Sequence, residues 1–211
     1  MRRLFPNLEQ KRLNFYNTLN SPIYNLTCRI EMAFSKDQLD FRQILFDRLD
    51  IKEGEKVIEI GSGTGFNIPY YPDNAEIYFF DINKHLIKKS RKKAEKHGKE
   101  NIDYVIGNMK KIGFKKNSFD VAVLTYALSG IPKNNRNFYQ VERIVRPGGR
   151  IGILDYETTE KALMSGMVDM NLNEILLYNL ADSKLFHKKV YGFDDSVNET
   201  IEHIYILENK Y

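Results

Sequence analysis

Short, largely apolar runs divide the middle of the chain at regular intervals. They occupy residues 57–60, 77–80, 102–106, 119–126 and 151–156. A run without a polar face is typical of a parallel strand that is covered on both sides. Two stretches of helical length, residues 83–97 and 132–146, lie between these runs. Strands that alternate with helices in this way predict βαβ units with right-handed crossovers and a parallel sheet.

The chain on either side of these runs has different patterns. Before them, apolar residues recur at steps of three and four within residues 8–49, which predicts helices. After them, residues 159–181 carry an apolar stripe with methionines and predict another helix. Two β-like runs, 185–193 and 201–208, then predict a hairpin with its loop at residues 194–198.

The composition is that of one folded domain. The chain has 211 residues, of which 42% are hydrophobic and 28% are charged, and we find no repeat or linker. These values are typical of a globular protein and not of a disordered one. We predict a single domain over residues 1–211, with N-terminal helices at 1–50, a core at 51–157, and a C-terminal helix and hairpin at 158–211.

Targeting and redox signals are weak. No apolar run approaches the roughly 20 residues that a membrane-spanning helix needs. The basic start at residues 1–6 is not followed by a long apolar segment, so we expect no signal peptide. The single cysteine, Cys28, fits a reducing compartment, and one Cys with four scattered His gives no zinc-ligand pattern. We therefore predict a cytoplasmic protein without a metal.

Positive charge is concentrated in one predicted helix. Residues 84–100 contain eight Lys or Arg and two Glu, a net charge of +6, so the rest of the chain sums to −2. This stretch has no aromatic residue that could stack on bases. We therefore predict a solvent-exposed basic face and expect no nucleic-acid partner.

The strongest candidate for chemistry follows the first predicted strand. Residues 57–65 read Val-Ile-Glu-Ile-Gly-Ser-Gly-Thr-Gly. Glycines at alternate positions let the backbone turn sharply and approach a ligand that a Cβ atom would exclude. Asp81 lies 20 residues after Gly61, at the end of the second run. In α/β sheets this arrangement binds a nucleoside, with the backbone beneath it and the carboxylate on the ribose hydroxyls.

The glycine spacing indicates which nucleoside is bound. Dinucleotide sites have G-x-G-x-x-G, but here Phe66 occupies the sixth position, and no G-x-x-x-x-G-K-[ST] loop is present. The pattern E-x-G-x-G-x-G resembles motif I of the class I S-adenosylmethionine (AdoMet) methyltransferases. AdoMet has no phosphate, and the acid Glu59 suits its ammonium end. The alternative is a plain tight turn without a ligand.

Further motifs extend this resemblance over residues 12–157. Asn67-x-Pro-Tyr-Tyr-Pro, residues 117–121 and residues 141–150 are similar to segments of small methyltransferases that act on phosphatidylethanolamine nitrogen or on quinone carbon. Residues 15–17 and 23–25 resemble the paired Tyr-Asp elements of that group, with Asn in place of both acids. The resemblance implies a Rossmann-like, doubly wound, seven-stranded α/β sheet that is mostly parallel, with an antiparallel last strand.

The resemblance also implies a cofactor site. It assigns the glycine loop to the methionine end of AdoMet, Asp81 to the ribose, and Ile82 to one face of the adenine. Asn108, where the group more often has Asp, would lie at the adenine edge and can both donate and accept. The predicted cofactor residues are Glu59, Gly61, Ser62, Gly63, Gly65, Asp81, Ile82, Asn108, Met109, Thr125 and Tyr16.

The implied reaction needs little acid–base chemistry. AdoMet carries its own leaving group, so the enzyme must mainly align a nucleophile in line with the methyl carbon, which is worth about 7–11 kcal/mol. If a base is required, Asp155 and Tyr126 at the ends of the fifth and fourth predicted strands are the candidates. We predict methyl transfer to a small-molecule or lipid- or quinone-like acceptor. The alternatives are a non-catalytic AdoMet-binding regulatory protein, or an RNA or protein methyltransferase.

The N-terminal helices are candidates for a lid. Ligands of open α/β sheets bind outside the carboxyl ends of the strands, so residues 1–34, with Tyr16 and Tyr24, are predicted to cover the site. Residues 1–20 contain four Lys or Arg and one Glu among apolar residues. This mixture leaves open peripheral contact with an anionic membrane, and a helix packed on the domain is the alternative.

Overall fold

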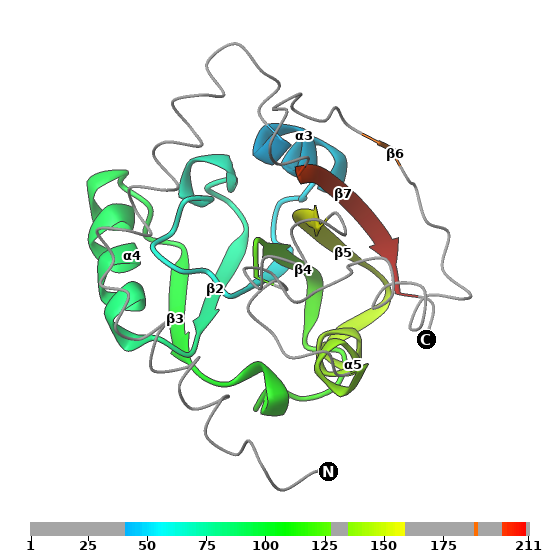
Figure 1. Cartoon of the computed structure of the whole chain (residues 1–211). Coiled ribbons are helices and arrows are strands. Elements are labelled where there is room, and N and C mark those ends of the chain that lie inside the picture. The colour runs from blue at the N-terminus through cyan, green and yellow to red at the C-terminus, as the bar shows by residue number, and fades with distance from the viewer. Residues whose placement is uncertain (1–40, 128–134, 159–187, 190–199, 210–211) are drawn as a thin grey trace, which may run out of the picture. The chain divides into compact units, whose positions relative to one another are not determined.

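A computed structural model describes residues 41–127, 135–158, 188–189 and 200–209 (Figure 1). The chain divides into two units, Met1–Asp40 and Phe41–Tyr211, and all of the described residues belong to the second. The predicted helices before residue 41, the helix at 159–181 and the loop at 194–198 lie outside the described residues. No helix in the described ranges is long and apolar enough to cross a membrane.

The centre of the unit is a mostly parallel sheet. Its strands are β1 (Lys56–Ile60), β2 (Glu76–Asp81), β3 (Ile102–Ile106), β4 (Phe119–Thr125), β5 (Val145–Thr158), β6 (Lys188–Lys189) and β7 (Thr200–Glu208). Their order is β3-β2-β1-β4-β5-β7-β6, and β1 to β5 pair in parallel. β7 runs antiparallel to β5 and to the two-residue strand β6. The predicted Rossmann-like sheet with an antiparallel last strand is therefore confirmed.

Helices and short 3₁₀ turns connect the strands. They are α3 (Phe41–Leu49), η2 (Ile68–Tyr70), α4 (Lys84–Lys96), η3 (Met109–Lys111) and α5 (Asn135–Ile144). α4 begins at Lys84, one residue after the predicted start, because Asn83 is its N-cap and accepts hydrogen bonds from the backbone of His85 and Leu86 with its side chain. Between β1 and β2 the chain forms only the short 3₁₀ helix η2, and Pro69 lies near its start.

Alternate residues of the strands build two apolar clusters. Ile58 and Ile60 of β1 pack in a cluster with α5, whereas Val57 packs in a second cluster with α3, η2 and α4. The central strands are therefore buried on both sides, as their apolar sequences indicated. Full burial of one such side chain contributes about 1.5–3 kcal/mol to stability.

The end of α5 differs from the prediction. We expected the helix to run to Arg146, but it ends at Ile144, and Val145 already pairs with Phe119 of β4. The residue before a proline avoids the helical conformation, so Pro147 ends the helix early. The segment Pro147–Gly149 lies within β5, where the N–H of Gly148 donates to the carbonyl of Asn209 and the N–H of Asn209 donates to the carbonyl of Gly149.

Candidate functional site

The glycine loop after β1 needs its glycines for conformation and for space. Gly61, Gly63 and Gly65 have φ angles of +73°, +55° and +73°, a region that side chains with a Cβ rarely adopt. A Cβ at Gly61 would lie 2.8 Å from the Cβ of Ala127, and one at Gly65 would lie 2.5 Å from Ile68 Cδ1. The loop therefore lies close to the chain that leaves β4.

Asp81 ties the end of β2 to this loop. Its Oδ2 accepts a hydrogen bond from the backbone N–H of Gly63 at 2.9 Å, and its Oδ1 accepts from the N–H of Asn83 at 2.7 Å. The side chain is almost buried, and burial raises the pKa of its carboxyl group. Each carboxylate oxygen still has a second lone pair. The predicted meeting of the acid and the loop is therefore present, with capacity left for ribose hydroxyls.

Glu59 lies below the loop, inside the protein. Only 1% of its surface is exposed. Tyr71 donates its hydroxyl hydrogen to Oε2 at 2.8 Å, and the Nδ2 of Asn67 donates to Oε1 at 2.9 Å. Burial raises the pKa of Glu59 to about 7, and the hydrogen bonds from Tyr71 and Asn67 oppose the rise. Both carboxylate oxygens are bound within the protein, so the role of Glu59 at the ammonium end of AdoMet stays a prediction.

A buried polar network continues from Glu59 to the end of β4. The Nδ2 of Asn67 also donates to the Oγ1 of Thr125, at 2.9 Å. Arg42 of α3 donates from Nη1 to Asn67 Oδ1 at 2.5 Å and to Thr125 Oγ1 at 3.3 Å. The network therefore joins α3, β1, the glycine loop and β4 at the carboxyl edge of the sheet.

Two aromatic rings flank the guanidinium of Arg42. Its carbon Cζ lies 5.0 Å from the ring centre of Tyr126 and 5.8 Å from that of Phe66. Lys93 of α4 approaches the same Phe66 ring, at 4.0 Å. Tyr126 has a φ angle of +51°, although its side chain is bulky. Such strained residues cluster at ligand sites, and here the strain ends β4 at Thr125, one residue earlier than predicted.

Ser62 supplies a test of whether a polar ligand fits this loop. The side chain is 4% exposed, and its hydroxyl has no hydrogen-bond partner among the described residues. A buried hydroxyl without a partner is uncommon in folded proteins and needs an explanation. A ligand with polar groups that lies on the glycine loop would provide one. The residues present therefore fit AdoMet at this position.

The part of the edge that the resemblance assigns to the adenine is open and partly apolar. Ile82 is 44% exposed, and Ile106, which pairs with Asp81 in the sheet, is 60% exposed. Met109 is half-buried against the core. Asn108 is exposed, and its Oδ1 accepts from the backbone N–H of Lys110 at 2.9 Å, which caps η3. The amide of Asn108 is thus partly committed to the protein.

Of the two candidate bases, Asp155 lies on β5, and Tyr126 follows directly after the neighbouring strand β4. The backbone N–H of Tyr126 donates to the carbonyl of Leu154 at 2.7 Å, which places Asp155 next to this contact on β5. Asp155 is 1% exposed. Tyr16 lies outside the described residues, as does Tyr24. The structure therefore brings together ten of the eleven predicted cofactor residues and both candidate bases along one edge.

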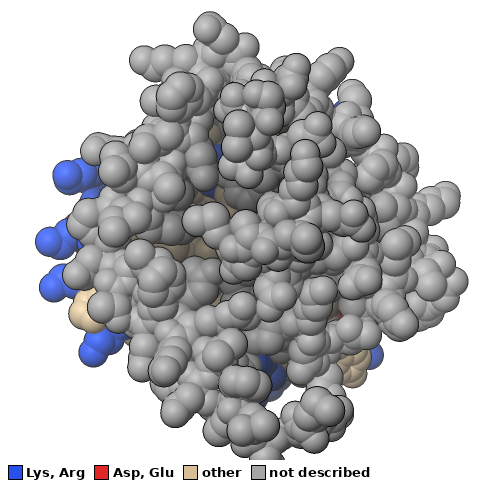
Figure 2. Space-filling view, in the orientation of Figure 1, with Lys and Arg blue, Asp and Glu red and all other residues tan. Residues whose placement is uncertain are grey.

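The basic helix α4 lies alongside β2 and β3 (Figure 1). Its exposed basic side chains are Lys84, Lys88, Lys89, Arg91, Lys92 and Lys96. Figure 2 shows Lys and Arg side chains projecting on the left, where Figure 1 places α4. The predicted solvent-exposed face is therefore present. The absence of a nucleic-acid partner stays a prediction.

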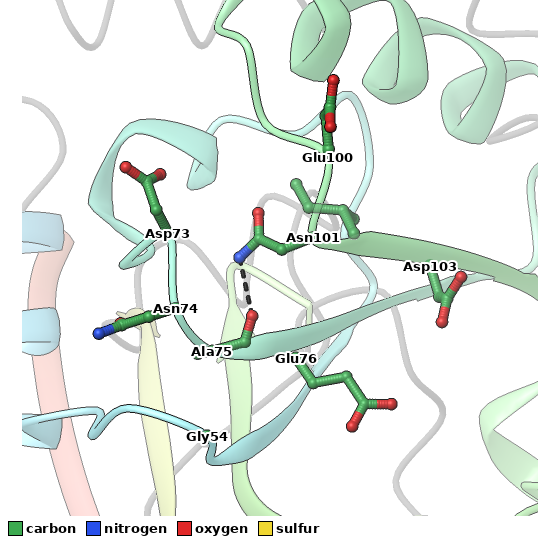
Figure 3. Close-up of a pocket in the computed structure, with 9 residues that line it drawn as sticks. Gly54, Asp73, Asn74, Ala75, Glu76, Glu100, Asn101 and Asp103 are labelled. Atoms are coloured by element: carbon green, nitrogen blue, oxygen red, sulfur yellow. Dashed lines mark hydrogen bonds between the residues drawn. The ribbon is translucent and has the colours of Figure 1, made fainter.

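A hollow at the opposite, amino-terminal edge of the sheet has a volume of about 370 Å³ (Figure 3). It is lined by Gly54, Asp73, Asn74, Ala75, Glu76, Glu100, Asn101, Ile102 and Asp103. Asn101 bridges it by donating to the carbonyl of Ala75 at 2.8 Å. Ligands of open α/β sheets bind at the carboxyl ends of the strands, so this hollow is not the candidate site. Within the described ranges, no cluster of His, Cys, Asp and Glu could hold a metal ion.

Comparison with known proteins identifies the family. Residues 23–186 match the sequence model of the ubiE/COQ5 methyltransferase family. The chain belongs to this family. It is 26% identical over 117 residues to the demethylmenaquinone methyltransferase of Paenarthrobacter aurescens, a match that covers 55% of this chain and 44% of the relative. The chain spans about half the length of the curated relatives it matches.

Solved structures share the fold of this family member. Phosphoethanolamine N-methyltransferase 2 of Haemonchus contortus, in complex with AdoMet, superposes with a TM-score of 0.68 at 12% identity, over 82% of this chain and 53% of that chain. The [4+2]-cyclase SpnF superposes with a TM-score of 0.68 at 15% identity, over 81% of this chain and 80% of that chain. Identities this low support the fold alone.

Three residues of the candidate site in this chain were not predicted from the sequence. Asn67 and Tyr71 stand in the motif that carried the resemblance, but a motif does not tell which of its side chains meet. Arg42 is 83 residues from Thr125, and nothing in the local sequence distinguishes it from other helical arginines. Only the packing of α3 on the sheet brings it to the edge.

Proposed function

We propose that this protein is an AdoMet-dependent methyltransferase that methylates a small, quinone-like acceptor. The observation that carries the proposal is the joined glycine loop and Asp81, with the hydroxyl of Ser62 buried and without a described partner. The glycine backbone lets a ligand approach closely, and the carboxylate of Asp81 can accept hydrogen bonds from two ribose hydroxyls. The buried hydroxyl of Ser62 can form a hydrogen bond with a polar group of the ligand.

The described residues have distinct roles in this proposal. Gly61, Ser62, Gly63 and Gly65 hold the methionine end, while Asp81 accepts from the ribose hydroxyls. The exposed side chain of Ile82 packs on the adenine, and Asn108 with Met109 borders its edge. When bound, AdoMet supplies an electrophilic methyl group together with its leaving group. The protein has to orient the acceptor and exclude water, and alignment of this kind is worth about 7–11 kcal/mol.

A base is needed only for an acceptor that binds protonated. Asp155 on β5 and Tyr126, directly after β4, lie at the carboxyl edge, where an acceptor would bind. We propose that one of them takes a proton from the acceptor, Asp155 before Tyr126, because at neutral pH an aspartate side chain is ordinarily ionised and can accept a proton, whereas a tyrosine hydroxyl ordinarily keeps its own. A family relative that methylates demethylmenaquinone supports a quinone-like acceptor. Peripheral membrane contact through residues 1–20 and a cytoplasmic location are part of the same proposal.

The test combines binding with turnover. Calorimetry should detect AdoMet binding, and Asp81→Ala should weaken it by about 1.5–3 kcal/mol, the value of a charge-assisted hydrogen bond. Methyl transfer from labelled AdoMet should appear with quinol precursors and not with RNA. Unchanged affinity in Asp81→Ala would overturn the site.

The rival function with specific support is that of a protein that binds AdoMet without transferring its methyl group. SpnF, whose solved structure is named a [4+2]-cyclase, has this fold, so the fold does not require methyl transfer. Asn108 also departs from the acid that is more usual in the family. A protein that binds AdoMet but transfers no methyl group to lipid extracts, quinols, amines or thiols would favour this rival.

A further inference from the structure

The hydroxyl group of Thr125 has its hydrogen-bonding role determined by its neighbours. Its Oγ1 accepts from Asn67 at 2.9 Å and from Arg42 at 3.3 Å. A threonine hydroxyl has two acceptor lone pairs and one hydrogen to donate. Because both lone pairs are occupied, the hydroxyl can only donate, and no described residue accepts from it.

The amide of Asn67 cannot reverse this polarity. The side chain is fully buried, with Oδ1 toward the guanidinium of Arg42 and Nδ2 toward Glu59. Reversal would place an N–H group of Asn67 against the guanidinium cation of Arg42, which has no acceptor. Arg42 therefore determines the orientation of Asn67, and through it the orientation of Thr125.

The donor hydroxyl lies where a ligand would meet it. Thr125 is the last residue of β4, and two residues later Ala127 touches the position of the missing Cβ at Gly61. The guanidinium of Arg42 lies beside it, over the ring of Tyr126. This corner therefore combines a hydroxyl that can only donate with a positive charge, at the carboxyl edge of the sheet.

We infer that Arg42 and Thr125 form an anion-recognising corner of the site. Thr125 donates to a negatively charged ligand oxygen, and Arg42 orients Thr125 and provides the favourable charge. The inference rests on the proposed function, which supplies the two candidate oxygens: the carboxylate of AdoMet and an ionised hydroxyl group of the acceptor. An ammonium group is disfavoured here, since it meets a cation and offers no lone pair.

Two binding measurements decide whether the cofactor supplies the oxygen. Calorimetry would compare AdoMet with its decarboxylated analogue on the wild-type chain, Arg42→Met and Thr125→Val. If the cofactor carboxylate is bound here, the wild-type chain prefers AdoMet, and both variants lose that preference. Their affinity for AdoMet then falls by about tenfold to a hundredfold, the value of a lost charge-assisted hydrogen bond.

Kinetics decide whether the acceptor supplies it instead. In that case both variants keep the affinity of the wild-type chain for AdoMet. Their KM for a quinol acceptor rises, and the pH at which kcat/KM reaches half its maximum moves upward, because the hydroxyl ionises less readily without the corner. Folded variants that change neither the AdoMet preference nor the pH profile would overturn the inference.

Matched variants separate this role from a structural one. Thr125→Ser keeps the hydroxyl and should restore the wild-type values, whereas Arg48→Met removes an exposed arginine from the same helix and should change nothing. Circular dichroism and thermal unfolding would confirm that each variant folds. A wild-type chain that fails to bind AdoMet would count against the proposed function. Normal wild-type binding with unaffected variants would count against this inference alone.

Discussion

The two edges of the sheet treat polar side chains in opposite ways. Near the carboxyl edge, Glu59, Asn67, Asp81 and Thr125 are each at most 7% exposed and bonded within the protein. At the amino edge, charges form ion pairs near solvent: Lys52 with Asp50, Lys56 with Glu76, and Lys99 with Asp73. Exposed pairs contribute about 0–1 kcal/mol each, whereas a buried polar group that loses its partner costs about 1–3 kcal/mol. Buried polar groups that bond within the protein therefore gather at the edge where we propose that the ligand binds.

Glycines show the same contrast. Gly54 at the amino edge and Gly61 at the carboxyl edge have φ angles of +72° and +73°. A Cβ at Gly54 would meet nothing within 4 Å, while one at Gly61 would collide with Ala127. Gly54 is therefore required only for the backbone conformation of a turn, whereas Gly61 is also required because Ala127 packs closely against it.

The largest expected effect comes from substituting these two glycines. Gly61→Ala should lower the free energy of unfolding by about 2–5 kcal/mol, because the clash adds to the cost of a left-handed backbone. Gly54→Ala should lower it by about 1–2 kcal/mol through the backbone alone. Chemical denaturation measures both, and AdoMet calorimetry should show weaker binding only for Gly61→Ala. Equal losses of stability would mean that the edges do not differ in packing.

The next effect is a pH dependence of stability that comes from Glu59. Its pKa in the folded chain is about 7, above the ordinary value of 4.5, so between these values the folded state holds a proton that the unfolded state releases. Stability should therefore fall as pH rises from about 4.5 to 7 and stay level above 7, by on the order of 1–3 kcal/mol. Glu59→Gln should remove this slope in denaturation curves recorded at pH 5 to 8.

Glu76 at the amino edge provides the control for this slope. The hydrogen bond from Tyr78, followed by that from Lys56, lowers the pKa of its carboxyl group. Its contribution has the opposite sign: it is present above the unfolded pKa and is lost as pH falls through the lower folded pKa. Glu76→Gln should therefore leave the fall in stability between pH 5 and 7 unchanged. If Glu76→Gln removed that fall, the assignment to Glu59 would be wrong.

Two tyrosines test how much a hydrogen bond to a carboxylate contributes to the free energy of unfolding at each edge. Tyr71→Phe removes a donor from the buried Glu59 and should cost about 1–3 kcal/mol of stability at pH 8. Tyr78→Phe removes a donor from the exposed Glu76 and should stay within about 0.5 kcal/mol. Urea unfolding of the two variants gives the comparison. A loss in Tyr78→Phe as large as that in Tyr71→Phe would contradict it.

The smallest expected effect concerns Asn108 at the adenine edge. Asn108→Asp still accepts from Lys110 and leaves a second oxygen for the adenine amino group. We expect AdoMet affinity to rise by about twofold to tenfold, the range of one hydrogen bond. Asn74→Asp, which adds the same charge in the amino-edge hollow, should leave the affinity unchanged in the same calorimetric titration. A fall in affinity for Asn108→Asp would show that the Asn amide donates to the cofactor.

Much of the fold and of the cofactor loop could be predicted from the sequence. The strand at residues 102–106 was predicted with its observed bounds, and β1 begins one residue earlier than predicted. Apolar runs and glycine spacing are local features, so they can be read without knowing what lies opposite. Asp81 could be placed beside the loop because neighbouring parallel strands end at the same edge.

The sequence by itself determined the alternation of strands and helices, the glycine turn and the acid that meets it, because each depends on local periodicity or backbone freedom. Only the tertiary structure decided that Glu59 is buried and bound by Tyr71 and Asn67, and that Arg42 orients Thr125. These outcomes depend on contacts between residues far apart in the chain. Burial and partner choice set both the pKa of Glu59 and the donor role of Thr125, and neither exists before the chain folds.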